Sequence, residues 1–504
     1  MSELNGFDLL AQKRQAASLG GGPEQQDAQH AKSKLTARER IEKLLDTQSF
    51  VETYTFVQHS NVLDGLDEVS APGEGVVTGY GTIDGRGVYV FSQDYTVLGG
   101  AMGAMHARKI CKLLELAGKT GLPVVAMLDS MGARIGEGAG ALEGFGSILC
   151  KLAELSGVVP VLTVVCGQCA GTAAFLTPMS DFVFMTEGVG GIYTTAPGAF
   201  NEMGKEPNAN ALGGPAVHTE KTGIAHFKSA SEEETFSKLR QLLSYLPDNN
   251  LVDAPMADCA DDLNRMIQNY ADAYDIKEML SSVMDNGILF EVQAAYASSM
   301  LTGFGRINGR SVGIVANAPG TELDAKSAGK AANFVSFCNA FGLPIITFTD
   351  TPGFVKDIEQ EQCCLIQAGA GLMRAYAEAT VPMLTVITGK AIGAGYVAMA
   401  PKALGADVVY AWPNAQISCL SADAAAIIFL QGDITGSDNP IEARKEAADK
   451  YAHTFASPWE AAKMGYVDEV IYPSETRQRL AGALELAVGK RESKLPKKHG
   501  TRLY

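Results

Sequence analysis

This sequence of 504 residues has no long apolar run, no excess of basic residues and little tryptophan. Two tryptophans occur, and no run approaches the ~18 uninterrupted apolar residues that a membrane-spanning helix needs. Acids outnumber bases by 57 to 41, which gives a net charge of −16. Because phosphate contacts need clustered Lys and Arg, we expect no nucleic-acid partner. Glu3 and Asp8 stand where a signal peptide has basic residues, so we expect a cytoplasmic protein.

Several catalytic motifs are missing as well. Gly118-Lys119-Thr120 resembles the end of a phosphate-binding loop, but Leu113 stands where the first glycine of that loop belongs. No GxGxxG follows a predicted strand, and no GxSxG nucleophile elbow occurs. The seven histidines are scattered without a carboxylate–histidine cluster, so no metal site is predicted. ATP hydrolysis, hydride transfer and serine hydrolysis are therefore disfavoured.

The nine cysteines show no framework spacing, so we expect free thiols in a reducing compartment. One pair, Cys166 and Cys169, has the CxxC spacing of a redox motif at the expected start of a helix. A second copy of this region contains no cysteine, which makes the redox interpretation the weaker one. A zinc site is weaker still, because no second CxxC completes four ligands.

The chain contains an internal duplication. Residues 77–86 (VTGYGTIDGR) reappear as residues 301–310 (LTGFGRINGR), and residues 121–129 reappear as residues 342–350. Three further matches pair Gly167 with Gly389, Gly171 with Gly393, and Lys109 with Lys330. The interval of about 220 residues is far longer than the roughly 20–50 residues of a solenoid repeat, so it indicates a duplicated domain.

Each copy alternates apolar strands with helices. The predicted elements are a hairpin at 77–90, helices at 105–117 and 330–340, strands at 123–128 and 344–348, and strands at 160–165 and 383–387. This alternation predicts an α/β fold with buried, largely parallel strands. Residues 246–250 (LPDNN) form a helix-stopping cluster, which favours two domains at residues 1–250 and 263–504.

A glycine-rich turn follows the last of these strands in each copy, at residues 167–173 (GQCAGTA) and 389–396 (GKAIGAGY). Backbone N–H groups at a helix start lack acceptors, and the helix dipole adds positive potential there. Such donors suit a carbonyl that becomes an enolate, whereas a turn that only packs helix on sheet is the alternative. Thr172 is β-branched, so we expect it to be helical, in the first turn.

Taken together, these segments resemble the carboxyltransferase subunits of biotin-dependent acyl-CoA carboxylases and decarboxylases over nearly the full length. The segments that carry the resemblance are residues 35–41 (LTARERI), 73–79 (GEGVVTG), 91–100 (FSQDYTVLGG), 129–135, 350–354, 404–413 and 490–500. The resemblance implies two tandem crotonase-like (ClpP/crotonase) domains. It also implies a homo-hexamer in which the first domain of one subunit faces the second domain of another.

The resemblance further implies that acyl-CoA binds at the first domain and biotin at the second. One oxyanion hole would stabilise a thioester enolate and the other a biotin enolate, with CO2 passing between them. No side-chain nucleophile is then required. The implied residues are Gly171, Thr172, Ala394 and Gly395 for catalysis, and Ala133, Arg134, Ala173, Gly393 and Tyr396 for CoA or biotin binding.

The implied partners follow from what the chain does not carry. Residues 462–464 (AKM) do not form the Met-Lys-Met of a biotinylation site, so biotin would arrive on a separate biotin carboxyl carrier protein. A biotin carboxylase or a membrane decarboxylase subunit would complete the complex, and a coenzyme A thioester would be the substrate. Lys32, Lys34, Arg38 and Arg40 are candidates to bind the anionic CoA, although a solvated helix face is the alternative.

Departures from the family pattern leave the acyl group open. The usual GPCAGG turn reads GQCAGT at residues 167–172, and Met131-Gly132 replaces a usual Gly-Gly. Gly136 replaces a usual Gln, residues 367–370 (QAGA) replace Arg-His-Gly-Ala, and Val397 replaces an acid found in some propionyl-CoA enzymes. The favoured function is carboxyl transfer with a small acyl-CoA of the propionyl or methylmalonyl type. The alternative is a crotonase-like CoA-binding or assembly subunit that has lost catalysis.

Overall fold

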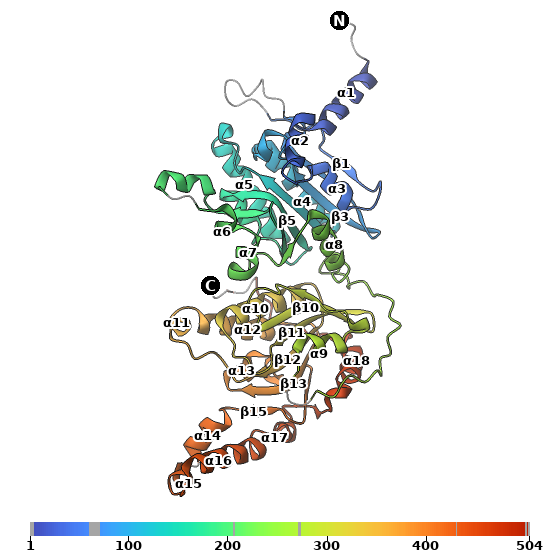
Figure 1. The fold of residues 1–504 in the computed structure, drawn as a ribbon. Helices are drawn as coiled ribbons and strands as arrows, with labels where there is room; N and C mark the ends of the chain where they lie inside the picture. The colour runs from blue at the N-terminus through green and yellow to red at the C-terminus, as the bar shows by residue number, and fades with distance from the viewer. Residues whose placement is uncertain are drawn as a thin grey trace. The chain divides into compact units, whose positions relative to one another are not determined.

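A computed structural model describes residues 5–59, 71–204, 207–270, 274–429, 431–498 and 501 (Figure 1). The chain divides into two compact units, Met1–Val252 and Asp253–Tyr504. Each unit contains one sheet of eight described strands covered by helices, so the predicted duplicated α/β fold is confirmed. Among the residues described, no helix combines the length and apolar character needed to cross a membrane.

The sheet of the first unit has the strand order β1-β2-β3-β4-β5-β6-β8, with β7 beside β5. Its strands are β1 (Val51–Thr53), β2 (Val76–Ile83), β3 (Arg86–Gln93), β4 (Val124–Ser130), β5 (Val161–Ala170), β6 (Phe182–Thr186), β7 (Gly191–Tyr193) and β8 (Phe227–Ser229). Strands β1 to β3 pair antiparallel, and the pairs from β3 through β8 are parallel. Its α-helices are α1 (Gly6–Leu19), α2 (Pro23–His30), α3 (Ala37–Leu44), α4 (Ala104–Thr120), α5 (Ala139–Leu155), α6 (Ala209–Gly213), α7 (Pro215–Val217) and α8 (Glu232–Leu243).

The second unit repeats this topology with the order β16-β14-β13-β12-β11-β10-β9, and β15 lies beside β13. Its strands are β9 (Phe290–Val292), β10 (Met300–Ile307), β11 (Arg310–Asn317), β12 (Ile345–Thr351), β13 (Met383–Ile392), β14 (Val408–Ala411), β15 (Gln416–Ser418) and β16 (Glu469–Val470). Its α-helices are α9 (Ile276–Val283), α10 (Ala325–Ala340), α11 (Ile358–Glu361), α12 (Leu365–Glu378), α13 (Ala394–Ala398), α14 (Ala422–Phe429), α15 (Gln431–Thr435), α16 (Pro440–Thr454), α17 (Pro458–Lys463) and α18 (Thr476–Ala487). The repeated strand order confirms the duplication seen in the sequence.

The hairpin that opens each repeat turns on a matching pair of residues. Asp84 and Gly85 have φ values of 50° and 77°, and Asn308 and Gly309 have 55° and 74°. Two successive positive φ angles define a type I′ turn, which Asp-Gly and Asn-Gly sequences favour. The turn therefore fixes the antiparallel register of β2 with β3 and of β10 with β11.

The matched lysines of the repeats have matched roles. Lys109 on α4 donates from its Nζ atom to the carbonyl oxygens of Gly73 and Val76, at 2.7 and 2.6 Å. Lys330 on α10 donates to the carbonyl oxygens of Gln293 and Tyr296, at 2.9 and 2.8 Å. Burial lowers the pKa of each lysine to about 8. Each lysine thus anchors the chain that leads into the hairpin of its own unit.

Candidate active site

The two glycine-rich turns lie at the carboxyl ends of β5 and β13. Both strands run further than predicted, to Ala170 and Ile392 rather than to residues 165 and 387, because the short strands β7 and β15 pair with their extensions. The chain then reverses at Gly171 and Gly393, whose φ values are 66° and 57°. A 3-10 helix, η4 (Gly171–Leu176), follows the first turn, and α13 follows the second.

The structure also sets the register between the two turns. Gly171 matches Gly393, since each has a positive φ directly after its strand. Thr172 and Ala173 therefore match Ala394 and Gly395. The predicted catalytic pairs, Gly171-Thr172 and Ala394-Gly395, are therefore one residue out of step with each other, as the pairing of Gly171 with Gly393 in the sequence repeat already implies.

Hydrogen bonds identify the backbone amides that can serve a ligand. The N–H of Gly393 already donates to the carbonyl oxygen of Ser418 at 2.8 Å. Ala394 and Gly395 come next, in the first turn of α13, where amides have no intrahelical acceptor. The matching amides of the first unit are those of Thr172 and Ala173, and Thr172 lies in the first turn of a helix as expected, although that helix is 3-10 rather than α.

The helix dipole contributes less than we expected. Helix η4 spans six residues and α13 spans five, so few peptide dipoles add along either axis. The positive potential at each turn therefore comes from the N–H groups themselves.

Gly395 is glycine because another backbone passes close to it. A Cβ atom at this position would lie 2.9 Å from the Cα of Gly353 and 3.0 Å from Cγ2 of Thr351. The matching residue of the first unit, Ala173, carries its Cβ in a buried site. The second turn is thus the more tightly enclosed of the two.

Gly167 and Gly389, the first glycines of the two glycine-rich turns, each lie against a carboxylate. A Cβ on Gly167 would overlap the Asp129 carboxylate, and a Cβ on Gly389 would overlap that of Asp350. These glycines make room for a carboxylate beside the strand. The Asp350 carboxylate accepts a hydrogen bond from the N–H of Lys390 at 2.8 Å.

Asp129 is the centre of a buried charge network. Its carboxylate accepts hydrogen bonds from Gln29 at 2.9 Å, from Lys34 at 2.6 Å and from Arg40 at 2.9 Å. Arg40 also pairs with Glu232 at 2.9 Å and donates to the carbonyl oxygen of Cys166 in β5. Despite its burial, the pKa of Arg40 is raised by these negative neighbours. The network thus connects α3 and the start of α8 to β4 and β5.

This network corrects the expectation for the basic residues. Arg40 is fully buried, Lys34 is nearly so, and Arg38 makes a two-pronged ion pair with Glu52 at 2.9 and 3.0 Å. They form neither a CoA-binding patch nor a solvated helix face. The signal is absent from the local sequence because the partners lie about 90 to 190 residues away. Lys32 is exposed, with its Nζ 5.5 Å from the ring centre of Tyr95.

The side chain of Arg134 is occupied by protein partners. Its guanidinium pairs with Glu74 and Glu137, both at 2.8 Å, and donates to the carbonyl oxygen of Ala101. Next to it, Ala133 bridges to Met102. The structure thus uses Arg134 to hold the loop after β4, and we assign its guanidinium no contact with CoA or biotin.

Two histidines of the first unit, His59 and His106, contact Glu74. His59 contacts the Glu74 carboxylate at 2.8 Å, and His106 contacts the Glu74 carbonyl oxygen at 2.8 Å. Burial lowers the pKa of His106 to about 3, so its ring is neutral at physiological pH. Both side chains therefore have structural roles.

The CxxC pair is not at a helix start. Cys166 and Cys169 lie within β5, three positions apart, so their side chains point to opposite faces of the sheet. Both are buried free thiols, and burial raises the pKa of Cys169 to about 12. A dithiol redox centre needs adjacent, ionisable sulfur atoms, so the structure rules against that interpretation.

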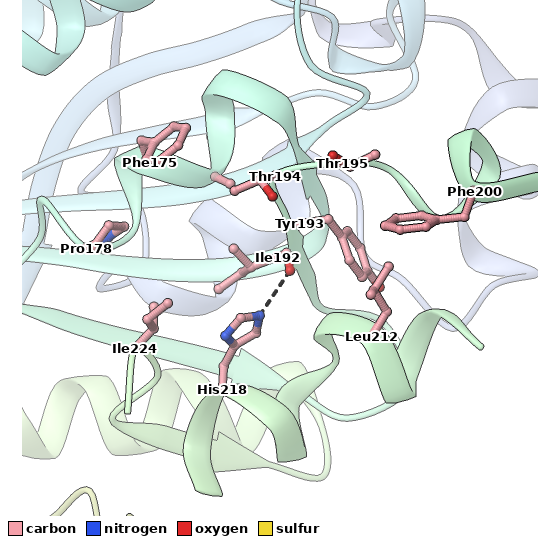
Figure 2. A pocket seen from close by; sticks show the side chains of 11 residues that line it. Phe175, Pro178, Ile192, Tyr193, Thr194, Thr195, Phe200, Leu212, His218 and Ile224 are labelled. Atoms are coloured by element: carbon pink, nitrogen blue, oxygen red, sulfur yellow. Dashed lines mark hydrogen bonds between the residues drawn. The ribbon is translucent and has the colours of Figure 1, made fainter. Parts of the chain in front are cut away.

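An apolar pocket of about 280 Å³ lies beside η4 (Figure 2). It is lined by Ala174, Phe175, Pro178, Ile192, Tyr193, Thr194, Thr195, Phe200, Leu212, His218 and Ile224. His218 is the only histidine in this lining. Its Nε2 atom contacts the Ile192 carbonyl oxygen and its Nδ1 atom contacts the Thr222 hydroxyl, both at 3.0 Å. With no charged carboxylate, lysine or arginine in its lining, the pocket suits an uncharged group. Sequence reasoning missed it.

Tyr396, the last of the predicted site residues, directly follows the second turn. It is half-buried and packs on a cluster that includes Ile387, Ala391 and Ala461. Burial raises the pKa of its hydroxyl. Across the described residues, no group of three or more His, Cys, Asp and Glu side chains gathers to hold a metal ion.

A solved structure with the same overall fold connects this geometry to a class of protein. The transcarboxylase 12S crystal structure, solved as a hexamer with methylmalonyl-coenzyme A and methylmalonic acid bound, matches with a TM-score of 0.96 at 39% identity. The match covers 100% of this chain and 99% of that chain. The fold is therefore the tandem crotonase-like α/β fold expected from the sequence.

Sequence comparisons identify the family. The carboxyl transferase domain model matches residues 28–502, so the chain belongs to the carboxyl transferase domain family. The methylmalonyl-CoA decarboxylase subunit alpha of Propionigenium modestum is 43% identical, with 97% of each chain covered. The propionyl-CoA carboxylase carboxyltransferase subunit of Haloferax mediterranei is also 43% identical, with 98% of each chain covered.

Proposed function

We propose that this chain moves a carboxyl group between biotin on a carrier protein and a small acyl-CoA of the propionyl or methylmalonyl type. The observation that carries the proposal is the matched pair of turns at Gly171 and Gly393. Each ends a central strand and presents successive backbone amides at the start of a short helix. The two relatives above and the transcarboxylase structure act on, or hold, compounds of this class by name.

In the first unit, the amides of Thr172 and Ala173 donate to the thioester oxygen of acyl-CoA. Negative charge develops on that oxygen when the adjacent carbon becomes nucleophilic. Donors that are already in position stabilise this charge without reorganising, and losing one typically costs ~2.7–4 kcal/mol of barrier. Because these donors are main-chain groups, the departure from glycine to Thr172 does not remove them.

In the second unit, the amides of Ala394 and Gly395 do the same for the ureido oxygen of biotin. Gly393 supplies the turn and not a donor, because its own N–H is bonded to Ser418. CO2 then passes from one stabilised anion to the other. No side-chain nucleophile takes part, which agrees with the neutral, structural state of His106.

The apolar pocket of Figure 2 belongs to the acyl-CoA side in this proposal. Ala174 and Phe175 of its lining directly follow the donor amides on η4. A pocket with an uncharged, mainly apolar lining suits the uncharged part of a thioester better than the CoA phosphates.

The wider assembly is part of the same proposal. It comprises a homo-hexamer, a biotin carboxyl carrier protein, and a biotin carboxylase or a membrane decarboxylase subunit. The acyl-CoA side is assigned to residues 1–250 and the biotin side to residues 263–504. A cytoplasmic location is supported by the nine cysteines, which are all free thiols.

The test is a decarboxylation screen of the purified protein with free biotin and malonyl-, methylmalonyl-, ethylmalonyl- or glutaconyl-CoA. We expect CO2 release with a clear preference for one substrate, and loss of release in Gly171→Pro. Proline at that turn fixes φ near −65°, where the structure has 66°. If an intact oligomer that still binds CoA releases no CO2 from any of the four substrates, the result would favour the binding or assembly subunit instead.

A further inference from the structure

Two adjacent cysteines, Cys363 and Cys364, lie in the bend between α11 and α12. Both are exposed, and their Sγ atoms are 3.5 Å apart. In an extended strand neighbouring side chains point to opposite sides, but this bend turns both to the same side. Their backbones are held in place, since the N–H of Cys363 donates to Gln360 and the carbonyl oxygen of Cys364 accepts from Ala368.

The thiol of Cys364 is also free of a capping role. Cys364 is the N-cap residue of α12, a helix of 14 residues, and its side chain makes no capping hydrogen bond. A helix N-terminus favours a thiolate. The hydrogen bond with Cys363 outweighs this effect and raises the pKa of the Cys364 thiol, because it stabilises the protonated form.

We propose that Cys363 and Cys364 form a two-thiol site that binds one soft, thiol-seeking centre, such as trivalent arsenic, through both sulfur atoms. A disulfide fits this pair poorly, because adjacent Cα atoms lie 3.8 Å apart and unstrained disulfides need at least ~4.4 Å. A single atom bound at ~2.3 Å from each sulfur fits a separation of 3.5 Å without movement. With an arsenoxide, two As–S bonds form, and the oxygen leaves as water with both thiol protons. Arsenic keeps its oxidation state.

The site is connected to the second turn by packing. Helix α12 contacts α13, the helix that starts at that turn. Its residue Gly369 lies against Phe354, since a Cβ there would be 2.9 Å from the ring. Phe354 follows Gly353, whose Cα would be 2.9 Å from a Cβ on Gly395. A group bound at the start of α12 therefore disturbs the turn that we assign to biotin. This consequence rests on the proposed function, whereas binding itself does not.

Binding is tested on the intact oligomer with phenylarsine oxide and intact-mass measurement. We expect one adduct per chain that survives excess 2-mercaptoethanol and is removed by 2,3-dimercaptopropanol. Cys363→Ser and Cys364→Ser should each abolish this resistance, whereas Cys150→Ser and Cys419→Ser, at two other exposed cysteines, should keep it. An adduct that a monothiol strips from the wild type, or that persists in Cys363→Ser, overturns the site.

The connection to the turn is tested by biotin-dependent CO2 release. We expect the adduct to lower the rate several-fold, 2,3-dimercaptopropanol to restore it, and the Cys363→Ser and Cys364→Ser variants to resist inhibition. A fully formed adduct with an unchanged rate overturns the connection. A wild type without carboxyl transfer contradicts the proposed function, while the mass measurement still decides the site.

Discussion

The two units use the same strand end but stabilise it differently. In both, an aspartate is the second-last residue of a strand and its N–H donates to a side-chain amide oxygen, from Asp129 to Gln93 at 3.1 Å and from Asp350 to Asn317 at 2.9 Å. Beyond that, Asp129 is fully buried against two cations, whereas Asp350 is half-buried and accepts one main-chain bond from Lys390.

The difference comes from segments outside the repeated core. Lys34 and Arg40 lie before and within α3, and Glu232 lies at the start of α8. Asp129 and Lys34 lie against Gly167 at the start of the first turn, while Gly395 in the second turn lies against the Gly353 backbone. The duplication therefore preserved the order of strand, glycine turn and helix, while the residues that support it diverged.

The largest expected effect is on the stability of the first unit. Asp129→Asn leaves Lys34 and Arg40 without their shared carboxylate, and breaking a buried pair in this way typically costs about 3–5 kcal/mol of unfolding free energy. Asp350→Asn keeps an oxygen that accepts from the N–H of Lys390 and leaves no buried cation unpaired, so we expect a cost of no more than about 1 kcal/mol. Denaturant unfolding, followed by hydrogen exchange in β4 and β12, measures both. Equal losses would show that the buried network adds nothing.

The second-largest expected effect is a difference between the two turns in how a substitution changes the rate of CO2 release. Gly395→Ala puts a Cβ against the Gly353 backbone, which displaces the donor amide, so we expect a ~10²–10³-fold loss in the rate of CO2 release. The matched change, Ala173→Gly, removes a Cβ that is already accommodated and should cost only a few-fold. Circular dichroism checks that both variants fold. A smaller loss in Gly395→Ala than in Ala173→Gly would contradict the assignment of donors.

The features of the two units that local sequence patterns encode could be predicted. Alternating apolar strands and helices, with matched turns such as Asp84-Gly85 and Asn308-Gly309, were sufficient to infer a duplicated α/β fold. The strand ends were placed too early, because β7 and β15 pair with β5 and β13 from a distance. The charge network was missed for the same reason, since Arg40 meets Glu232 only after the chain has folded. Roles that depend on partners far along the chain leave no local pattern.

A third prediction compares two aspartates by their pH dependence. Asp181 accepts a hydrogen bond from the N–H of Val161 at 2.8 Å, and Asp407 accepts the same bond from Met383. Asp407 also pairs with Lys490 at 3.0 Å. Burial raises the pKa of Asp181 to about 7. Between about pH 4 and 7, the folded chain therefore holds a proton that the unfolded chain has released, so stability falls as pH rises.

Asp181→Asn should remove this fall and raise the stability of the first unit at pH 8 by about 1–2 kcal/mol, because the amide oxygen still accepts from Val161. Asp407→Asn should lower the stability of the second unit by roughly 1 kcal/mol, since it breaks the pair with Lys490. Thermal melts from pH 4 to 8, resolved by hydrogen exchange in each unit, measure the slopes. An unchanged slope in Asp181→Asn would show that a group other than Asp181 causes the fall.

The smallest expected effect is that of a substitution that makes the end of β5 resemble the end of β13. Cys169 matches Ala391 in the repeat, and both are buried. Cys169→Ala removes one sulfur atom from the core, so we expect a cost of about 1 kcal/mol and a CO2-release rate within roughly two-fold of the wild type. The reason is that the amides of the turn, and not the thiol, carry the proposed chemistry. Loss of activity in a folded Cys169→Ala variant would instead give the thiol a chemical role, and the parallel between the two turns would fail at that position.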